Sequence, residues 1–311
     1  MRSVMFSPTG SLLGTASDDT TARLWDLADP THPYLLCSLQ HEGKVTSAAF
    51  SPDDPAIFAT GGEAAIRLWN VKNPRHSNPL GALPLAPGEA ALSLAFCRGR
   101  LILISGDEGG TVHVWNIADP SHPAPLGSPL EGDADRVDFL ACSLDGRILA
   151  VAGTGTVRLW DLADHTQPTP VGQLLGGNEK AVNSVTFGPD SLTVATAADD
   201  GVVILWDVTT PSQPSPLGPP LRAHSDRVTS ITFSPKDPRI MATASDDTTV
   251  QLWDLADRTR PLPLGPPLEG HKKAVNSVAI GPTNIMATGS DDQTVRLWNL
   301  AQLDGLPIAP T

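Results

Sequence analysis

Serine, histidine and aspartate recur together along the sequence, and these are the residue types of a hydrolase triad. One set consists of His224, Ser245 and Asp247. Nucleophilic catalysis needs an exposed hydroxyl, a base within reach and donors for an oxyanion. The chain has no Gly-x-Ser-x-Gly sequence, which would place a serine on a strand-to-helix elbow. We therefore predict that these residues serve the fold, that none is catalytic and that the protein is not an enzyme.

Paired aspartates are the second candidate for chemistry, because carboxylates bind calcium and magnesium. The pairs are Asp18-Asp19, Asp199-Asp200, Asp246-Asp247 and Asp291-Asp292. Calcium loops of the hand type need oxygen ligands at alternating positions and a closing glutamate, which these stretches lack. Aspartate also bonds its own backbone in tight turns. We predict turns without a metal or cofactor, and leave a weakly held ion on a central axis as the alternative.

The candidate residues belong to a phrase that repeats along the chain. All seven tryptophans lie in it, at Trp25, Trp69, Trp115, Trp160, Trp206, Trp253 and Trp298, separated by 44 to 47 residues. Periods of this length indicate stacked supersecondary units, none of which can bury its apolar faces alone.

Each unit has the pattern of an all-β element. Residues 45–54 form a β-rich run ended by Ser-Pro-Asp, Ile57–Gly62 a second run, and Ala65–Asn70 a third. A fourth run is rich in proline, as in residues 216–221. Proline cannot donate to a strand ladder, so this run should be the outermost strand. The sequence predicts a seven-bladed β-propeller with four antiparallel strands per blade, divided at about 1–40, 41–86, 87–132, 133–177, 178–223, 224–270 and 271–311.

The units resemble tryptophan-aspartate (WD) repeats over the whole chain. The resemblance implies a buried hydrogen-bond chain of histidine, serine or threonine, aspartate and tryptophan, matched by His224, Ser245, Asp247 and Trp253 and by His271, Ser290, Asp292 and Trp298. Ser245 is interpreted as the acceptor for the Trp253 indole. Other units depart from the set, for example with Gly61 and Glu63 in the second, and with Pro87, Asp133, Thr154 or Asn178 elsewhere. The style of the repeats is also similar to propellers of actinobacterial signalling proteins.

The resemblance further implies a top face that binds partners, reached by loops next to the first strand and the turn aspartate. The residues at those positions are Asp18, Glu42, Lys44, Glu108, Arg136, Asp199, Arg227, Asp246, Lys272 and Asp291. One interpretation is ordinary solvated loop charge. The other is a docking surface for a basic or mixed-charge peptide or domain, since binding concentrates on loops held by a rigid scaffold.

Composition limits the class of partner and the compartment. The 311 residues include 34 acidic and 21 basic ones, giving a net charge of −13, without a basic block. We therefore expect protein partners, including further domains of the same polypeptide, and neither nucleic acid nor membrane. The three cysteines show no Cys-x-x-Cys spacing, which argues against a disulfide framework and fits a reducing cytoplasm. His32, His76, His122 and His165 are expected to be solvent-exposed loop residues.

The two ends of the sequence carry their own expectations. Met1 aligns with Val45, inside the first strand of its unit, so we expect a missing upstream segment. Residues 300–311 are expected to form the outer strand of the last unit, which would leave ring closure to side-by-side packing. The function predicted from the sequence is a non-enzymatic protein-interaction scaffold or docking module of a larger bacterial signalling protein. One alternative is an enzyme or small-ligand binder that uses the central channel. A second is a purely structural role inside an autoinhibited multidomain switch.

Overall fold

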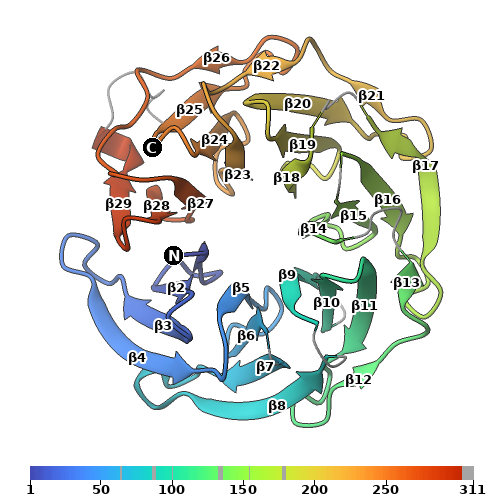
Figure 1. The fold of residues 1–311 in the computed structure, drawn as a ribbon, viewed down its shortest axis with the longest axis vertical. Coiled ribbons are helices and arrows are strands. Elements are labelled where there is room, and N and C mark those ends of the chain that lie inside the picture. Colours follow the sequence, from blue (N-terminus) through green and yellow to red (C-terminus); the bar gives the residue numbers. More distant parts are fainter. Residues whose placement is uncertain are drawn as a thin grey trace.

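Seven sheets are arranged as blades around a central axis in a computed structural model of the protein (Figure 1). The structure describes residues 1–63, 65–85, 89–99, 101–131, 136–153, 155–176 and 180–302. Every strand pairing is antiparallel, and strand order follows chain order from the axis outward, as in β1-β2-β3-β4. The predicted seven-bladed propeller with four-stranded blades is confirmed.

Blade one contains β1 Ser3–Phe6, β2 Leu12–Ala16, β3 Thr21–Asp26 and β4 Tyr34–Gln40, and blade two contains β5 Val45–Phe50, β6 Ile57–Gly62, β7 Ala65–Asn70 and β8 Asn78–Pro84. Blade three contains β9 Ala91–Cys97, β10 Ile102–Asp107, β11 Thr111–Asn116, β12 Ala124–Pro125 and β13 Leu130–Glu131. Blade four contains β14 Phe139–Cys142, β15 Ile148–Ala152, β16 Val157–Asp161 and β17 Thr169–Leu175. Blade five contains β18 Val182–Phe187, β19 Thr193–Ala198, β20 Val202–Asp207, β21 Ser215–Pro216 and β22 Leu221–Arg222. Blade six contains β23 Val228–Phe233, β24 Ile240–Ser245, β25 Val250–Asp254 and β26 Leu262–Pro263. Blade seven contains β27 Val275–Ile280, β28 Ile285–Ser290 and β29 Val295–Asn299. Two short 3₁₀ turns complete the described elements: η1 Pro74–His76 and η2 Leu300–Gln302.

The proline-rich runs form the outermost strands, as predicted. Pro79, Pro125, Pro170, Pro216 and Pro263 each lie opposite the tryptophan of their own blade. In blades three and five the outer strand consists of two short pieces on one neighbour, because proline cannot continue the ladder. In the seventh blade three strands are described, and most of the expected outer strand, residues 303–311, lies outside the described residues.

The core lies between blades and not within them. Each of seven buried apolar clusters takes its residues from two neighbouring blades. The tryptophan of each blade packs towards the blade before it, as Trp69 does against Leu24 and Ala22 of blade one. A single sheet would therefore leave both faces in water, and burial requires the ring.

The ring closes where β1 packs beside β27 (Figure 1). The Asn276 side-chain amide donates to the Met1 carbonyl at 3.0 Å, and the terminal ammonium of Met1 donates to the Ser290 carbonyl at 3.4 Å. Among the described residues, β1 and β27 thus pack side by side at the seam. The expectation that residues 300–311 complete the last blade stays a prediction.

A disulfide contradicts the expectation from the cysteine count. Cys97 at the end of β9 and Cys142 at the end of β14 are bonded, with their Cα atoms 5.5 Å apart. They are separated by 45 residues, one repeat, so stacking of adjacent blades brings equivalent strand ends together. The odd count and the absence of Cys-x-x-Cys carried no information about this pairing, which depends on the period of the repeat.

Candidate functional site

The predicted partner-binding residues lie on one end of the propeller, which we call the top face and define by the turns between the second and third strands. In blades two, three, five, six and seven, a backbone N–H of this turn donates to the carbonyl of the residue just before the first strand. The Asp246 N–H donates to the Arg227 carbonyl at 3.0 Å, and the Asp291 N–H donates to the Ala274 carbonyl at 3.0 Å. Glu108 and Asp199 make the same bond to Ala90 and Ala181. In blade six the two residues chosen from the sequence, Arg227 and Asp246, are thus neighbours.

Ion pairs join many of these charges. Arg227 lies between two of the acids, with its Nε 2.9 Å from Asp246 of its own blade and 3.9 Å from Asp199 of the preceding blade. Asp199 also accepts from the Asn183 amide at 2.8 Å. The charges at the boundary of blades five and six therefore form a connected set, and are not separate solvated side chains.

An ion pair within blade one lies at the seam between the last and first blades. Arg2 Nε donates to both carboxylate oxygens of Asp18, at 2.8 and 2.9 Å. Arg2 Nη2 lies 2.7 Å from Oδ2 as well, and these hydrogen bonds hold the pKa of the Asp18 carboxyl below its usual range. Asp291, on the other side of the seam, accepts from the Asn276 amide.

The remaining predicted residues divide into paired and single charges. Glu42 pairs with Arg67 at 3.2 Å, Lys44 with Glu63 at 3.4 Å, and Arg136 with Asp138 at 2.6 Å. The side chains of Glu108 and Lys272 have no ion pair among the described residues. Such exposed pairs stabilise the fold by only about 0.2–1 kcal/mol each, so a partner can exchange them for its own charges at small cost.

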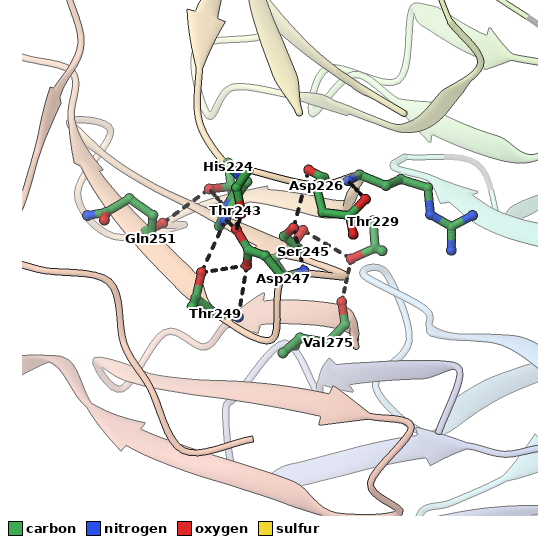
Figure 2. Close-up of polar contacts among 12 residues, drawn as sticks. His224, Asp226, Thr229, Thr243, Ser245, Asp247, Thr249, Gln251 and Val275 are labelled. Atoms are coloured by element: carbon green, nitrogen blue, oxygen red, sulfur yellow. Dashed lines mark hydrogen bonds and ion pairs between the residues drawn. The ribbon is translucent and has the colours of Figure 1, made fainter. Parts of the chain in front are cut away.

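Beneath the top face, a buried hydrogen-bond chain anchors the turn of blade six (Figure 2). His224 Nδ1 lies 3.0 Å from Asp247 Oδ2, and His224 Nε2 lies 2.8 Å from the hydroxyl of Thr243. The Trp253 indole donates to the same hydroxyl at 3.0 Å. Since the Asp247 carboxylate can only accept, Nδ1–H of the neutral imidazole donates to it, which leaves Nε2 to accept from the Thr243 hydroxyl.

The Asp247 carboxylate also shapes the turn itself. It accepts from the backbone N–H of Thr249 at 3.0 Å and from the Thr249 hydroxyl at 2.7 Å. Burial alone would raise the pKa of Asp247, but these bonds and the neighbouring His224 lower it overall. Asp292 holds the equivalent positions in blade seven, with His271 Nδ1 3.0 Å away. The predicted role of the paired aspartates as turn residues is confirmed at the second member of these pairs.

The interpretation of Ser245 as the acceptor for Trp253 is wrong, and so is its counterpart for Ser290 and Trp298. The acceptors are Thr243 and Thr288, two residues earlier on the same strand face. Trp253 lies opposite Met241, so Thr243 is its diagonal neighbour, while Ser245 is a further step of about 7 Å along the strand. Ser245 instead accepts from the Asp247 N–H at 3.0 Å and donates to the Asp226 carbonyl (Figure 2).

The sequence did contain the signal for the true acceptor. A hydroxyl residue stands at this strand position and accepts the indole in six blades: Thr15, Thr60, Ser105, Thr196, Thr243 and Thr288. Blade four has Val151 there, opposite Arg158, and its buried Trp160 indole N–H has no acceptor among the described residues.

Six of these repeats match a known family model. The family model "WD domain, G-beta repeat" (WD40) matches residues 1–26, 33–70, 125–161, 169–207, 216–254 and 264–299. The chain belongs to the WD40 family. The six matched WD40 repeats leave out the segment that contains β9 to β11. There Asp107 occupies the place of Ser245, and His113 stacks on Trp115 with ring centroids 5.3 Å apart.

The WD40 fold is also found among solved structures. A chain of a structure described as the crystal structure of a mitotic checkpoint complex superposes with a TM-score of 0.79, covering 96% of this chain and 89% of that one at 20% identity. A comparison with curated protein sequences gave no match. At this identity the structural likeness concerns the fold alone.

Some residues that depart from the WD40 hydrogen-bond set lie in the described part of the chain, and others lie outside it. Blade two keeps His41, whose Nε2 lies 2.9 Å from Thr60, but Glu63 pairs with Lys44 and not with the histidine. Burial, with the nearby Arg67 charge, lowers the pKa of His41 to about 4. Pro87, Asp133, Thr154 and Asn178 lie outside the described residues.

The loop histidines lie on the opposite end or the rim of the propeller. His32, His76 and His122 are exposed, as expected, but His165 is not: 8% of its surface is accessible. It lines a hollow between blades three and four with Ile102 and Leu126, because the blade-four turn packs against its neighbour. In the described part of the chain, no three His, Cys, Asp or Glu side chains are grouped to hold a metal ion. No described helix is long and apolar enough to cross a membrane.

Proposed function

We propose that this WD40 propeller is a non-enzymatic protein-interaction scaffold whose top face binds a basic or mixed-charge segment of a partner protein. The observation that supports this most directly is the connected set of Asp199, Arg227 and Asp246 across two blades. These charges stand on turns held by buried hydrogen bonds, so they present a fixed pattern of both signs. Such patterns select partners and increase association rates more than they increase affinity.

The central channel supports the alternative of an enzyme or small-ligand binder less well. The innermost strands β1, β5, β9, β14, β18, β23 and β27 contain no aspartate, glutamate, histidine, lysine or arginine. Several of their polar side chains join blades: Ser184 accepts from the N–H of Ile231, and Ser230 from that of Val278. A channel site would need convergent titratable groups, which these strands do not supply.

The wider setting is part of the same proposal. The fold neighbour is a chain of a structure described as a mitotic checkpoint complex. From the style of the repeats we infer a similarity to propellers of large actinobacterial signalling proteins. We place the chain in the cytoplasm as a docking module of such a bacterial protein, with other proteins or further domains of its own polypeptide as partners. A reducing cytoplasm would keep Cys97 and Cys142 as thiols, so their redox state in cells tests this location.

The experiment is an affinity capture that compares the wild type with a variant carrying Asp246→Lys and Asp291→Lys. Lys236→Glu, on the turn between β23 and β24 at the opposite end, is the matched charge reversal. Partners identified by mass spectrometry should be lost with the top-face variant and retained with Lys236→Glu. Equal recovery by all three proteins, with all three folded by circular dichroism, would refute a top-face site.

A further inference from the structure

The outer strand of blade one, β4, lacks a feature that the other described outer strands share. In blades two to six the residue opposite the tryptophan is a proline, as Pro79 of β8 is opposite Trp69. In blade one the residue opposite Trp25 is Leu35. Both β4 and β8 bulge by one residue directly after this position, so the two strands differ in the proline and not in the bulge.

The absence of proline leaves a backbone donor on the rim of the propeller. Proline has no N–H, so the ladder with the third strand uses no donor at this position in blades two to six. In blade six it is the next residue, Leu264, that donates inward, to the Leu252 carbonyl at 2.8 Å. The N–H of Leu35 therefore points away from β3, along the outside of the ring (Figure 1).

Two other devices that protect an exposed strand edge are also missing from β4. Natural edges are blunted by charged side chains or by a very short strand. β4 extends over seven residues, Tyr34–Gln40, and contains no charged residue. Tyr34 and Leu35 are 43% and 42% exposed, so the edge begins with two apolar side chains in solvent. Such an edge can pair with an added strand through main-chain hydrogen bonds.

A cation lies at the Tyr34 end of this edge. The Arg75 guanidinium, from η1 of blade two, lies over the Tyr34 ring, with Cζ 5.0 Å from the ring centroid. Arg75 is exposed and has no ion pair among the described residues. A carboxylate on an added strand would meet it there. If the added strand continues the antiparallel sheet, the residue opposite Tyr34 lies at its C-terminal end.

A second copy of this chain fits the edge less well than a different protein. Two β4 strands in full antiparallel overlap would place Gln40 of one copy opposite Tyr34 of the other, and Gln40 has no charge for Arg75. Each copy also has a net charge of −13, so two copies repel each other.

We propose that the outer edge of β4 is a docking site for an extended, proline-free segment of a partner protein with an acidic residue at its C-terminal end. The segment adds an antiparallel strand to blade one. One of its main-chain carbonyls accepts from the Leu35 N–H, and its carboxylate pairs with Arg75. This site lies on the rim and selects an acidic segment, so it is separate from the top face.

The test uses a labelled synthetic peptide, TVSITVE, titrated into the full chain and followed by fluorescence anisotropy. We expect saturable binding, and hydrogen exchange at the Leu35 amide slowed about tenfold or more. Leu35→Pro introduces the residue found in blades two to six, so it should keep the fold by circular dichroism and weaken binding about tenfold. Leu35→Ala, the matched control, keeps the N–H and should bind much more tightly than Leu35→Pro.

Arg75 provides a second readout, which decides the question if Leu35→Pro does not fold. Arg75→Glu should weaken binding of TVSITVE about fivefold and strengthen binding of TVSITVK by a similar factor. The top-face variant should bind TVSITVE like the wild type, so failure of this site is distinguishable from failure of the top face.

Three results would overturn the proposal. The first is absence of saturable binding, and the second is equal binding by the wild type and a folded Leu35→Pro variant. The third is a peptide-free dimer, seen by analytical ultracentrifugation, that Leu35→Pro dissociates, because β4 would then pair with a second copy of the chain.

Discussion

The backbone N–H of Val4 donates to the hydroxyl of Ser277 at 3.1 Å, joining the first blade to the last. The same bond joins neighbours elsewhere in the chain: Leu94 to Ser47, Leu140 to Ser93, Ile231 to Ser184 and Val278 to Ser230. The seam at which the ring closes is therefore built like an internal boundary.

Ser277→Ala should destabilise the protein because it leaves the buried N–H of Val4 without an acceptor. The expected loss is about 1–3 kcal/mol of unfolding free energy, measured by urea denaturation. Ser184→Ala, at an internal boundary, is the matched control and should cost a similar amount. A loss confined to Ser184→Ala would mean that the seam does not contribute to stability.

Thr243 and Ser245 should differ in their effect on stability. Thr243→Val removes the acceptor of Trp253 and the partner of His224 Nε2, leaving both buried, with an expected cost of about 1–3 kcal/mol. Ser245→Ala removes one turn bond and should cost about 0.5–1.5 kcal/mol. Thermal unfolding of the two variants measures this difference. A larger loss of stability in Ser245→Ala than in Thr243→Val would mean that Ser245, and not Thr243, is the main hydroxyl of the hydrogen-bond chain.

Blade four offers a stabilising substitution. Val151→Thr keeps the side-chain shape and places a hydroxyl where six other blades have one, next to the unsatisfied Trp160 indole. We expect a gain of about 1 kcal/mol in unfolding free energy. Val151→Ala provides no acceptor and should destabilise the protein. If Val151→Thr were no more stable than the wild type, the indole would have to be satisfied by water.

Acidification should weaken the fold through His41. Its folded pKa of about 4 lies below the ordinary value of 6.5, so the unfolded chain binds the proton more readily. The contribution of His41 is therefore complete above pH 6.5 and is lost as the pH falls towards 4. His41→Gln should show a smaller drop in melting temperature between pH 7 and pH 4.5 than the wild type. Identical pH profiles would contradict burial of a neutral imidazole at this position.

The disulfide predicts a reductant-sensitive stability. Closing a loop of 45 residues between Cys97 and Cys142 should stabilise the protein by about 4 kcal/mol in the chain-entropy model. A dithiol reductant should lower the melting temperature of the wild type and leave that of the Cys97→Ser, Cys142→Ser double variant unchanged. An unchanged melting temperature in a sample where Cys97 and Cys142 titrate as thiols after reduction, in addition to the free Cys37, would show that the bond adds no stability.

Sequence alone determined the repeat architecture. Seven tryptophans at a nearly constant interval, β-rich runs and a proline-rich fourth run are local patterns, and each follows from backbone chemistry that operates within a few residues. The resemblance to WD repeats indicated the top-face positions, and the regular spacing of the repeats gave the equivalent residue in each blade.

Only the tertiary structure decided which side chains meet. The acceptor of Trp253 is Thr243 and not Ser245 because the register of β24 and β25 sets the diagonal, and the Cys97–Cys142 bond exists because adjacent blades stack in register. Arg227 bridges Asp199 and Asp246 for the same reason. Local patterns specify strands and turns, but contacts between blades depend on the rotation of one sheet against the next, which no single repeat contains.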